Sequence, residues 1–484
     1  MSTKGTIVRH DQFFIDGGWV VPAGASRIEV VSPNTGEIIG DVPEAGTADI
    51  DTAVAAARRA FDDPQGWSQW TPRQRADAIE RLADEIDARK DEIARLVSSQ
   101  NGMPISTSLG LEAVFPSAVY RYYAGLVRDQ PVEEERPGLL GGTTLVRRIP
   151  IGVVGAIVPW NYPQTLASFK IAPALASGCT IVVKPSPETV LDDYVFAQAV
   201  EAAQLPPGVI NIVPGGREAG RALVEHPGID KIAFTGSTAA GREIAATCGR
   251  LLRPVTLELG GKSAAVLLDD VDLAASMQGL YGATLLNNGQ TCFAGTRILA
   301  PRSRYDEVVE AFAGLLQSLP IGDSLDEATL VGPMATSAQR DRVESFIARG
   351  RSEGGRVAVG GGRPQELGRG WFVEPTLLTG LDNSATVSQD EIFGPVLVVI
   401  PYDDIEHAVR IANDSPYGLG GSVWTADHGR GVDVARRIHT GTIGVNGYLP
   451  DPTAPFGGVK ASGIGRELGP EGLASYQTAQ SIYL

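Results

Sequence analysis

The chain has 484 residues and a formal net charge of −16. This length exceeds what a single hydrophobic core supports, so we predict two or three domains. Hydrophobic residues make up 43% of the chain and charged residues 20%, proportions that exclude a disordered polypeptide. The acidic balance argues against binding to nucleic acid or to an anionic membrane surface.

Cysteine and histidine are too sparse to organise the fold. The 3 cysteines and 5 histidines lie far apart, which argues against a disulfide framework and against a metal site. The N-terminal segment MSTKGTIVRHDQFF lacks the apolar region of a secretory signal, so we expect a cytoplasmic protein. Residues 149–183 carry only one charge, that of Lys170, but prolines interrupt them. We therefore expect buried strands and helices there, and no membrane span.

The N-terminal region begins with short strands and turns, in FFIDGGWV and in RIEVVSPNTGEIIGDVP. A helix is predicted over Thr47–Phe61. A second helix is predicted from Arg73 to Ser99, because Asn101 and Gly102 are good stop signals.

From residue 151 onward, short apolar runs alternate with helical stretches. The strands are expected at Val153–Val158, Thr180–Val183, Val209–Val213, Lys231–Phe234 and Val255–Leu259. Continuous apolar strands separated by helices predict βαβ units and a parallel sheet covered on both faces. A second alternating block begins near Ser263. The expected class is therefore α/β, with two such units.

Polar residues follow several of these strands, at the edge where open α/β sheets bind ligands. Gly236 and Gly241, with small residues between them, would let a helix N-terminus approach a diphosphate. A plain tight turn gives the same pattern. Lys184 follows TIVV and would either bind ribose hydroxyls or lie in solvent.

Three further residues could carry chemistry. Cys292 lies in the polar loop LLNNGQTCFAGT, as a nucleophile or as a small buried residue. Glu258 lies between leucines, where desolvation would suit a general base, or it pairs with Lys262. Lys170 must be paired, functional, or extended to the surface along its apolar stem.

Cys179 and Cys248 lie in a strand and a helix and are expected to be structural.

The segments TLELGGKS and GQTCFAG together resemble the two signature segments of the aldehyde dehydrogenase superfamily. Other landmarks, from SPNTGEII to PFGGVKASGIGRELG, occur in the family's order along nearly the whole chain. The resemblance implies a Rossmann-like dinucleotide-binding domain (1–121 and 146–259) and a second α/β catalytic domain (260–445). It also implies a small β oligomerisation region (122–145 and 446–484) and a homodimer or homotetramer.

The resemblance also implies catalytic roles. Cys292 would attack an aldehyde to give a thiohemiacetal and then a thioester. The Asn161 amide and the Cys292 backbone N–H would hold the oxyanion, and Glu258 would activate the water that hydrolyses the thioester. Lys170 would join a proton relay. Coenzyme-A-acylating relatives typically lack the glutamate, so this chain is expected to release a free acid.

NAD is the cofactor that the resemblance implies, with NADP as a weaker alternative. The residues implied to bind it are Trp160, Lys184, Ser186, Gly236, Ser237, Gly241, Glu391 and Phe393. Relatives with strict NAD preference often carry a glutamate three residues after the ribose-binding lysine, where this chain has Pro187. Glu188 is expected to point elsewhere. We therefore predict NAD to be preferred over NADP by no more than about a hundredfold, or ~2.7 kcal/mol.

The residues implied to line the substrate tunnel are Phe115, Tyr162, Phe169, Thr291, Phe293 and Phe456. This wall is mostly aromatic and has no evident arginine, so we expect an apolar aliphatic, aromatic or terpenoid aldehyde. A betaine-aldehyde or semialdehyde dehydrogenase is the alternative. A non-catalytic structural member of the same fold is a second alternative, although Cys292, Glu258 and Asn161 are all present.

Overall fold

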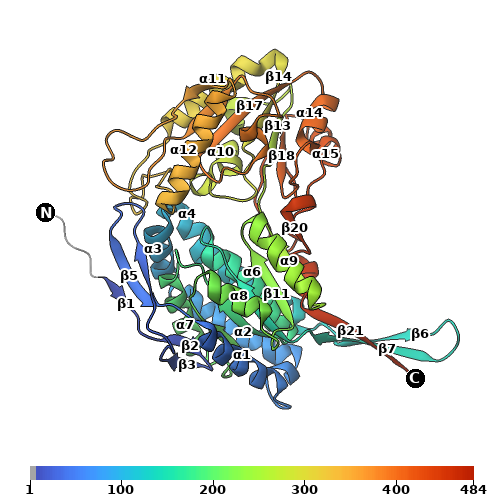
Figure 1. Cartoon of the computed structure of the whole chain (residues 1–484). Helices are drawn as coiled ribbons and strands as arrows, with labels where there is room; N and C mark the ends of the chain where they lie inside the picture. Colours follow the sequence, from blue (N-terminus) through green and yellow to red (C-terminus); the bar gives the residue numbers. More distant parts are fainter. Residues whose placement is uncertain (1–6) are drawn as a thin grey trace.

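The computed structural model describes residues 7–484. It contains two large sheets in separate halves of the molecule, and a narrow three-stranded arm projects from the lower half (Figure 1). The α/β class expected from the sequence is confirmed. No helix within 7–484 combines the length and the apolar character needed to cross a membrane.

The first large sheet has the strand order β20-β12-β11-β8-β9-β10-β2-β3. Its parallel strands are β8 (Val153–Ile157), β9 (Thr180–Lys184), β10 (Ile210–Ile212), β11 (Lys231–Thr235) and β12 (Val255–Glu258). The antiparallel strands at its two edges are β2 (Phe13–Ile15), β3 (Gly18–Val20) and β20 (Gly463–Ile464). Every residue of β8, β9 and β11 is buried, as a parallel sheet covered on both faces requires.

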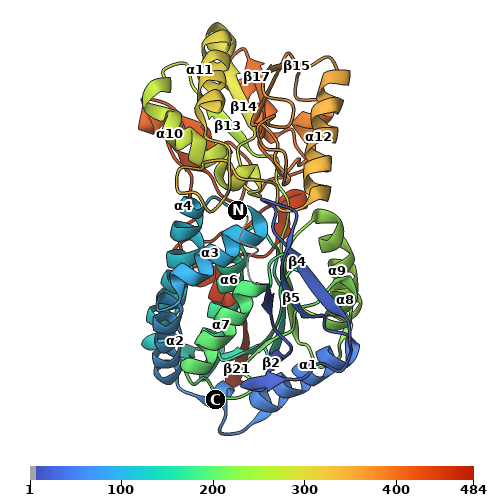
Figure 2. The ribbon, with the colours of Figure 1, turned by 90° about the vertical axis from the view of Figure 1, so that its left-hand side faces the viewer.

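Helices cover both faces of this sheet (Figure 2). The crossover helices are α6 (Pro163–Ser177), α7 (Leu191–Ala202), α8 (Arg217–Glu225) and α9 (Thr238–Arg250). The N-terminal helical elements are α1 (Thr47–Asp62), η1 (Trp67–Gln69), α2 (Pro72–Asp87), α3 (Lys90–Asn101), α4 (Ile105–Ser108), η2 (Leu109–Val114) and α5 (Phe115–Arg128). The helix predicted from Arg73 to Ser99 is therefore two helices. They separate at Arg89, whose φ of −115° is not helical.

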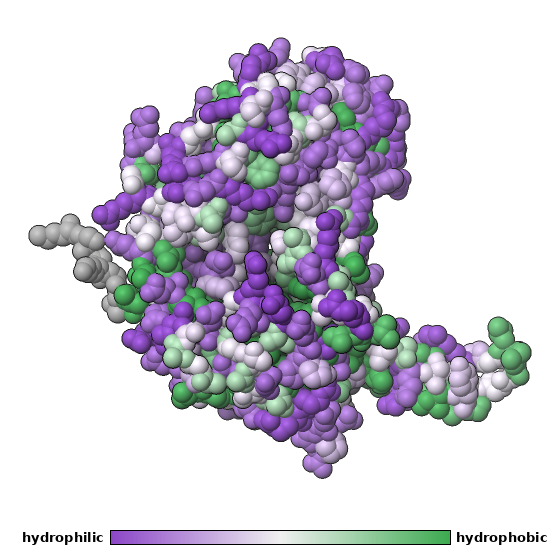
Figure 3. Space-filling view, viewed as in Figure 1, coloured by the Kyte–Doolittle hydropathy of each residue, from purple (hydrophilic) through white to green (hydrophobic). Residues whose placement is uncertain are grey.

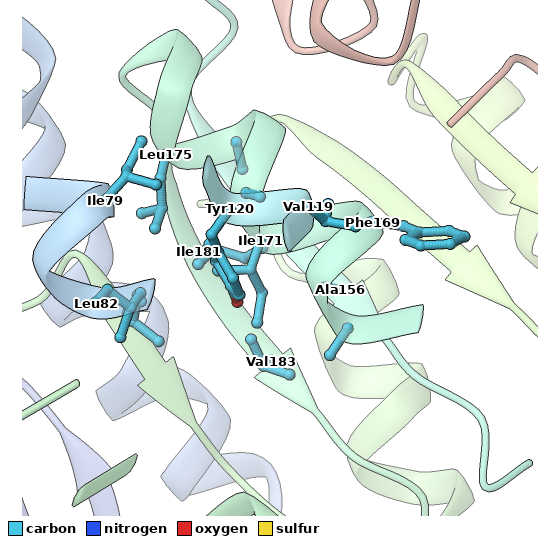
Figure 4. Packing of buried hydrophobic residues seen from close by; sticks show 14 of the residues in the cluster. Ile79, Leu82, Val119, Tyr120, Ala156, Phe169, Ile171, Leu175, Ile181 and Val183 are labelled. Atoms are coloured by element: carbon cyan, nitrogen blue, oxygen red, sulfur yellow. The ribbon is translucent and has the colours of Figure 1, made fainter. Parts of the chain in front are cut away.

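Helix α6 lies at the centre of the first half, and all its residues are buried. Figure 4 shows Ile171 and Leu175 of α6 facing Ile79 of α2 and Tyr120 of α5. The side chains on one face of β8 and β9, namely Val154, Ala156, Ile181 and Val183, belong to the same core. This packing keeps the N-terminus of α6, which follows Asn161, in a fixed position.

The second large sheet has the order β15-β16-β17-β14-β13-β18-β19, and only the β15–β16 pair is antiparallel. Its strands are β13 (Ala264–Leu267), β14 (Arg297–Pro301), β15 (Arg356–Val359), β16 (Thr376–Thr379), β17 (Val396–Tyr402), β18 (Gly421–Trp424) and β19 (Gly444–Val445). Its helical elements are α10 (Leu273–Thr284), η3 (Leu286–Gly289), η4 (Arg302–Arg304), α11 (Tyr305–Ser318), α12 (Ser337–Ser352), α13 (Thr386–Gln389), α14 (Ile405–Asn413) and α15 (His428–Ala435).

The projecting arm is the sheet β21-β7-β6, which stands away from the body in Figure 3. Its strands are β6 (Glu133–Pro137), β7 (Thr143–Pro150) and the C-terminal β21 (Gln477–Tyr483). A separate small sheet consists of β1 (Val8–Arg9), β4 (Arg27–Val31) and β5 (Ile38–Pro43). The remaining short elements are η5 (Lys460–Ser462) and α16 (Gly469–Ala474).

The arm is narrower than the ranges 122–145 and 446–484 expected from the sequence. Tyr123 belongs to α5 and is buried in the main core. Phe456, Leu468 and Tyr476 belong to that core too, and β20 pairs with β12 in the first sheet. These apolar side chains would be exposed on a two-faced arm, so most of the C-terminal segment packs on the body.

Candidate active site

The candidate nucleophile lies where the two large sheets meet. Cys292 is in the loop between η3 and β14 and is partly exposed, whereas Cys179 and Cys248 are buried. The turn that precedes it contains three consecutive left-handed residues, Asn287 (φ 52°), Asn288 (φ 60°) and Gly289 (φ 72°). Asparagine and glycine tolerate this conformation better than other residues.

The side chains of the two asparagines hold this turn in place. Asn288 Nδ2 donates to the carbonyl oxygens of Gly102 (2.8 Å) and Pro333 (3.1 Å). Asn287 Nδ2 donates to the Asn161 carbonyl oxygen at 2.9 Å. The turn before the nucleophile is therefore anchored to both halves of the molecule.

Asn161 follows β8 and lies beside the nucleophile loop. Its Nδ2 donates to the Gln290 carbonyl oxygen at 3.0 Å, and its side chain is buried. A primary amide has two N–H groups, so one remains for a ligand oxygen. The structure thus places the Asn161 side chain against the loop two residues before Cys292.

Burial raises the pKa of the Cys292 thiol, and the nearby Glu391 and Glu258 carboxylates raise it further. The resting group is therefore a thiol, and attack requires that its proton be removed.

Glu258 is the last residue of β12 and is 2% exposed. Neither of its carboxylate oxygens accepts a hydrogen bond from any residue of 7–484, and the same range offers no partner to the buried Lys262 ammonium. The alternative of a Glu258–Lys262 salt bridge is therefore wrong. Burial, and then the neighbouring Glu467, raise the pKa of Glu258 well above its usual range. A carboxylate in this state is suited to general-base chemistry.

Lys170 is completely buried in α6 and does not extend to the surface. Its Nζ donates to Glu467 Oε1 at 2.7 Å and to Thr235 Oγ1 at 2.6 Å. Thr235, which accepts from Lys170, is the register partner of Glu258 in the β11–β12 pair, so the Lys170–Glu467 pair lies near the candidate base. Sequence reasoning missed Glu467; the need of a buried lysine for a counter-ion was the signal that could have prompted a search for it.

Lys184 ends β9 and is buried rather than solvated. Its Nζ donates to the carbonyl oxygens of Pro185 (2.6 Å) and Gly215 (2.7 Å), which leaves one N–H free. Burial lowers its pKa to about 8, and Glu188 is the first group that opposes this shift. The Ser186 hydroxyl donates to Glu188 Oε2 at 2.5 Å. Glu188 therefore bonds to Ser186, and within residues 7–484 no ion pair joins it to Lys184.

The strand–turn–helix after β11 has the shape of a phosphate-binding turn. Ser237 is the N-cap of α9, and its Oγ accepts from the Ala240 backbone N–H at 3.3 Å. A Cβ at Gly236 would lie 2.6 Å from the Phe234 ring, so no larger residue fits there. A Cβ at Gly241 would lie 2.5 Å from the Leu259 side chain. The close packing of α9 against Leu259 is therefore enough to explain the glycine at position 241. The diphosphate contact expected for Gly241 is not needed for that explanation.

Glu391, Phe393 and Trp160 lie at the other end of this cofactor edge. Glu391 Oε1 accepts from the Gly261 backbone N–H at 3.0 Å, and burial raises the pKa of Glu391 to about 7. The Trp160 and Phe393 rings meet edge to face at 5.3 Å. Together with Lys184 and the N-terminus of α9, these groups offer the acceptors, the cation and the helix end that a dinucleotide requires, so the edge fits NAD.

Five aromatic rings form an unbroken chain of contacts that includes Phe293, the residue after Cys292. The ring centroids are separated by 6.1 Å for Phe115–Phe169, 6.2 Å for Phe169–Phe456, 6.2 Å for Phe456–Phe293 and 4.8 Å for Phe293–Tyr448. Sequence reasoning missed Tyr448, which follows Asn446-Gly447 without a recognisable motif. The two hydroxyl-bearing members of the predicted wall differ from the rest, because Tyr162 and Thr291 bond to each other at 2.7 Å.

A parallel-sheet cofactor edge beside a cysteine, an amide and a buried carboxylate is typical of a dehydrogenase that works through a thiol. The model of the Aldehyde dehydrogenase family matches residues 19–482. Geranial dehydrogenase of Castellaniella defragrans is 54% identical over 477 residues, which cover 99% of each chain.

Two solved structures extend the comparison. An aldehyde dehydrogenase from Mycobacterium tuberculosis complexed with NAD+ has a TM-score of 0.97 at 47% identity, covering 99% of each chain. A mutant of aldehyde dehydrogenase C from Pseudomonas syringae, complexed with NAD+ and octanal, has a TM-score of 0.94 at 40% identity, covering 98% of this chain and 96% of the other. The chain belongs to the aldehyde dehydrogenase family. Its activity is the NAD-dependent oxidation of aldehydes.

Proposed function

We propose that this enzyme oxidises an apolar aldehyde, aliphatic or terpenoid in character, to the free carboxylic acid. The observation that carries this proposal is the aromatic chain from Phe115 to Tyr448, which includes Phe293, the residue next to the nucleophile. Such a wall gains free energy from burying hydrocarbon and offers nothing to a substrate carboxylate. The 54% identity to a geranial dehydrogenase supports the same class of substrate.

Once the Cys292 thiol has released its proton to solvent, its sulfur adds to the carbonyl carbon and gives a thiohemiacetal. The free N–H of the Asn161 amide and the backbone N–H of Cys292 stabilise the charge on the former carbonyl oxygen. Lys184, the N-terminus of α9 and Glu391 would hold NAD, which would supply the acceptor for the hydride of this carbon. What remains on Cys292 is a thioester.

Glu258 then removes a proton from water, whose oxygen adds to the thioester carbon. The carbon–sulfur bond breaks, the carboxylic acid departs, and the Cys292 sulfur is restored. The absence of hydrogen-bond partners for Glu258 among residues 7–484 supports this role, because an unengaged carboxylate is free to bind water. The nearby Lys170–Glu467 pair is suited to exchange the proton.

A substrate panel tests the proposal. The purified enzyme is mixed with NAD and, in turn, geranial, octanal, benzaldehyde, betaine aldehyde and succinic semialdehyde, and the reduced cofactor is followed by absorbance. We expect kcat/KM to be highest for the apolar aldehydes. A higher value for betaine aldehyde or for the semialdehyde would contradict the proposed substrate class, although not the reaction.

We also propose that the molecule is a homodimer or homotetramer, assembled through the arm. Leu139 and Leu140 are fully exposed at the hairpin of the arm, where Figure 3 shows hydrophobic side chains. Isolated apolar side chains at the end of a thin sheet favour burial by a second copy. Light scattering coupled to gel filtration is expected to give a multiple of 50.9 kDa. A double replacement of Leu139 and Leu140 by serine should reduce that mass.

A further inference from the structure

Two hydrogen bonds join residues 161–162, which follow β8, to residues 290–291, which directly precede Cys292. Asn161 Nδ2 donates to the Gln290 carbonyl oxygen at 3.0 Å, and the Tyr162 hydroxyl lies 2.7 Å from Thr291 Oγ1. The paired residues are consecutive on both sides, 161–162 against 290–291. The second bond is thus the last side-chain link before the nucleophile.

The direction of the second bond follows from hydroxyl chemistry. Thr291 Oγ1 donates its only hydrogen to the Leu286 carbonyl oxygen at 2.8 Å. The Tyr162 hydroxyl must therefore be the donor to Thr291. Both side chains are buried, at 7% and 4% exposed. Both hydroxyl hydrogens are used in this series of hydrogen bonds, from Tyr162 to Thr291 to Leu286, so neither hydroxyl can donate to a substrate.

These hydrogen bonds adjoin a strained stretch of backbone, residues 287–289, which would relax without support from its surroundings. Asn287, Asn288 and Gly289 are all left-handed, and such a run persists only when its surroundings determine it. The clamps of Asn288 to Gly102 and Pro333 hold the beginning of the turn. At its end, next to Cys292, Thr291 is held by Leu286 and Tyr162.

We propose that the Tyr162 hydroxyl, acting through Thr291, is a positioning group that sets the Cys292 backbone N–H at the correct distance from the Asn161 amide. This proposal rests on the proposed function, in which those two donors hold the oxyanion. It revises the sequence expectation that Tyr162 and Thr291 are substrate contacts. Oxyanion donors must be placed to within a fraction of an ångström, so loss of the bond slows the chemical step and leaves binding unchanged.

The first test is Tyr162→Phe, which keeps the ring and removes the hydroxyl. Reduced cofactor is measured in the first turnover with saturating octanal, by rapid mixing. We expect the first-turnover rate to fall about tenfold to a hundredfold, less than the complete loss of an oxyanion donor. The KM for octanal and the Kd for NAD should remain unchanged. A wild-type rate, or a change confined to KM, would overturn the proposal.

Position 291 supplies an independent test if Tyr162→Phe fails to fold. Thr291→Ser keeps the hydroxyl and should retain the wild-type first-turnover rate, whereas Thr291→Val should be as slow as Tyr162→Phe. The double variant Tyr162→Phe/Thr291→Val should be no slower than Thr291→Val alone, because both changes break one chain of bonds. Equal rates for Ser and Val at this position would contradict the proposal.

Two controls separate positioning from other effects. Tyr402→Phe removes a similarly buried hydroxyl, which donates to Leu267 at 2.6 Å on the far side of the second sheet. Its first-turnover rate should not change. The ratio of kcat/KM for octanal over benzaldehyde should be the same in Tyr162→Phe and wild type; a shifted ratio would identify Tyr162 as a substrate contact instead. If the wild-type enzyme forms no covalent adduct on Cys292, the proposed function itself is contradicted, whatever the result for Tyr162→Phe.

Discussion

The Lys170 ammonium donates to the Glu467 carboxylate at 2.7 Å, and neither side chain is more than 1% exposed. These residues are 297 positions apart in the chain. The Glu467 backbone also exchanges two hydrogen bonds with Phe456, at 2.7 and 2.8 Å. One residue of the C-terminal segment therefore supplies the counter-ion of the buried lysine and holds a ring of the substrate wall.

This buried pair should matter for stability. Lys170→Met leaves the Glu467 charge without its partner in the core, which should lower the free energy of unfolding by about 3–5 kcal/mol. Urea denaturation followed by fluorescence measures the change. The double variant Lys170→Met/Glu467→Leu should recover most of the loss. As a control, Arg302→Met breaks the exposed Arg302–Asp403 pair and should change stability by less than about 1 kcal/mol.

Replacement of Cys292 by alanine should abolish turnover and leave NAD binding intact, because hydride departs only from the covalent adduct. A residual rate above about a hundredth of wild type, equivalent to ~2.7 kcal/mol of barrier, would contradict the covalent mechanism. Calorimetric titration with NAD checks binding. The control Cys248→Ala removes a buried thiol in α9 and should remain active.

Glu258→Gln preserves size and removes the base. The steady-state rate should fall, and the thioester should accumulate if hydride transfer remains fast. Intact-mass spectrometry after mixing with NAD and octanal should show the acyl group on Cys292. An unmodified protein with an unchanged rate would mean that another group activates water.

The pH dependence of thioester hydrolysis should report the raised pKa of Glu258. A base acts in its ionised form, so the rate should rise with pH over a range that lies above the pKa of an ordinary glutamate. A glutamate of ordinary pKa would be ionised, and the rate already constant, above about pH 6. Arg466 lowers the pKa of Glu258, so Arg466→Gln should move the midpoint to higher pH. A midpoint that stays fixed or moves downward would argue that Glu258 is not the titrating base.

Cofactor preference should depend on Glu188. Its carboxylate bonds to Ser186 and raises the pKa of Lys184, so it would repel a 2′-phosphate bound near the lysine, whereas Lys184 would attract the same phosphate. We therefore keep the prediction that kcat/KM for NAD exceeds that for NADP by no more than about a hundredfold. Glu188→Gln should reduce this ratio by raising kcat/KM for NADP. An unchanged ratio in the variant would exclude Glu188 as the discriminating group.

The sequence alone was sufficient for local features and for the family. Alternating apolar runs and helices predicted the parallel strands from β8 to β12, because burial on both faces leaves a direct compositional trace. The signature segments identified the family, and the placement of Cys292 beside Asn161 agrees with what the resemblance implied. Lys170 is the only charged residue in 149–183, which indicated that it needed a partner.

Which groups meet across the fold was decided only by the tertiary structure. Nothing local in the chain pairs Lys170 with Glu467, or distinguishes the hydroxyls of Tyr162 and Thr291 from the apolar wall around them. Each of these contacts joins elements whose separation and rotation depend on the packing of the whole core. Sequence periodicity specifies which face of an element is buried, whereas hydrogen-bond partners require positions accurate to a few tenths of an ångström.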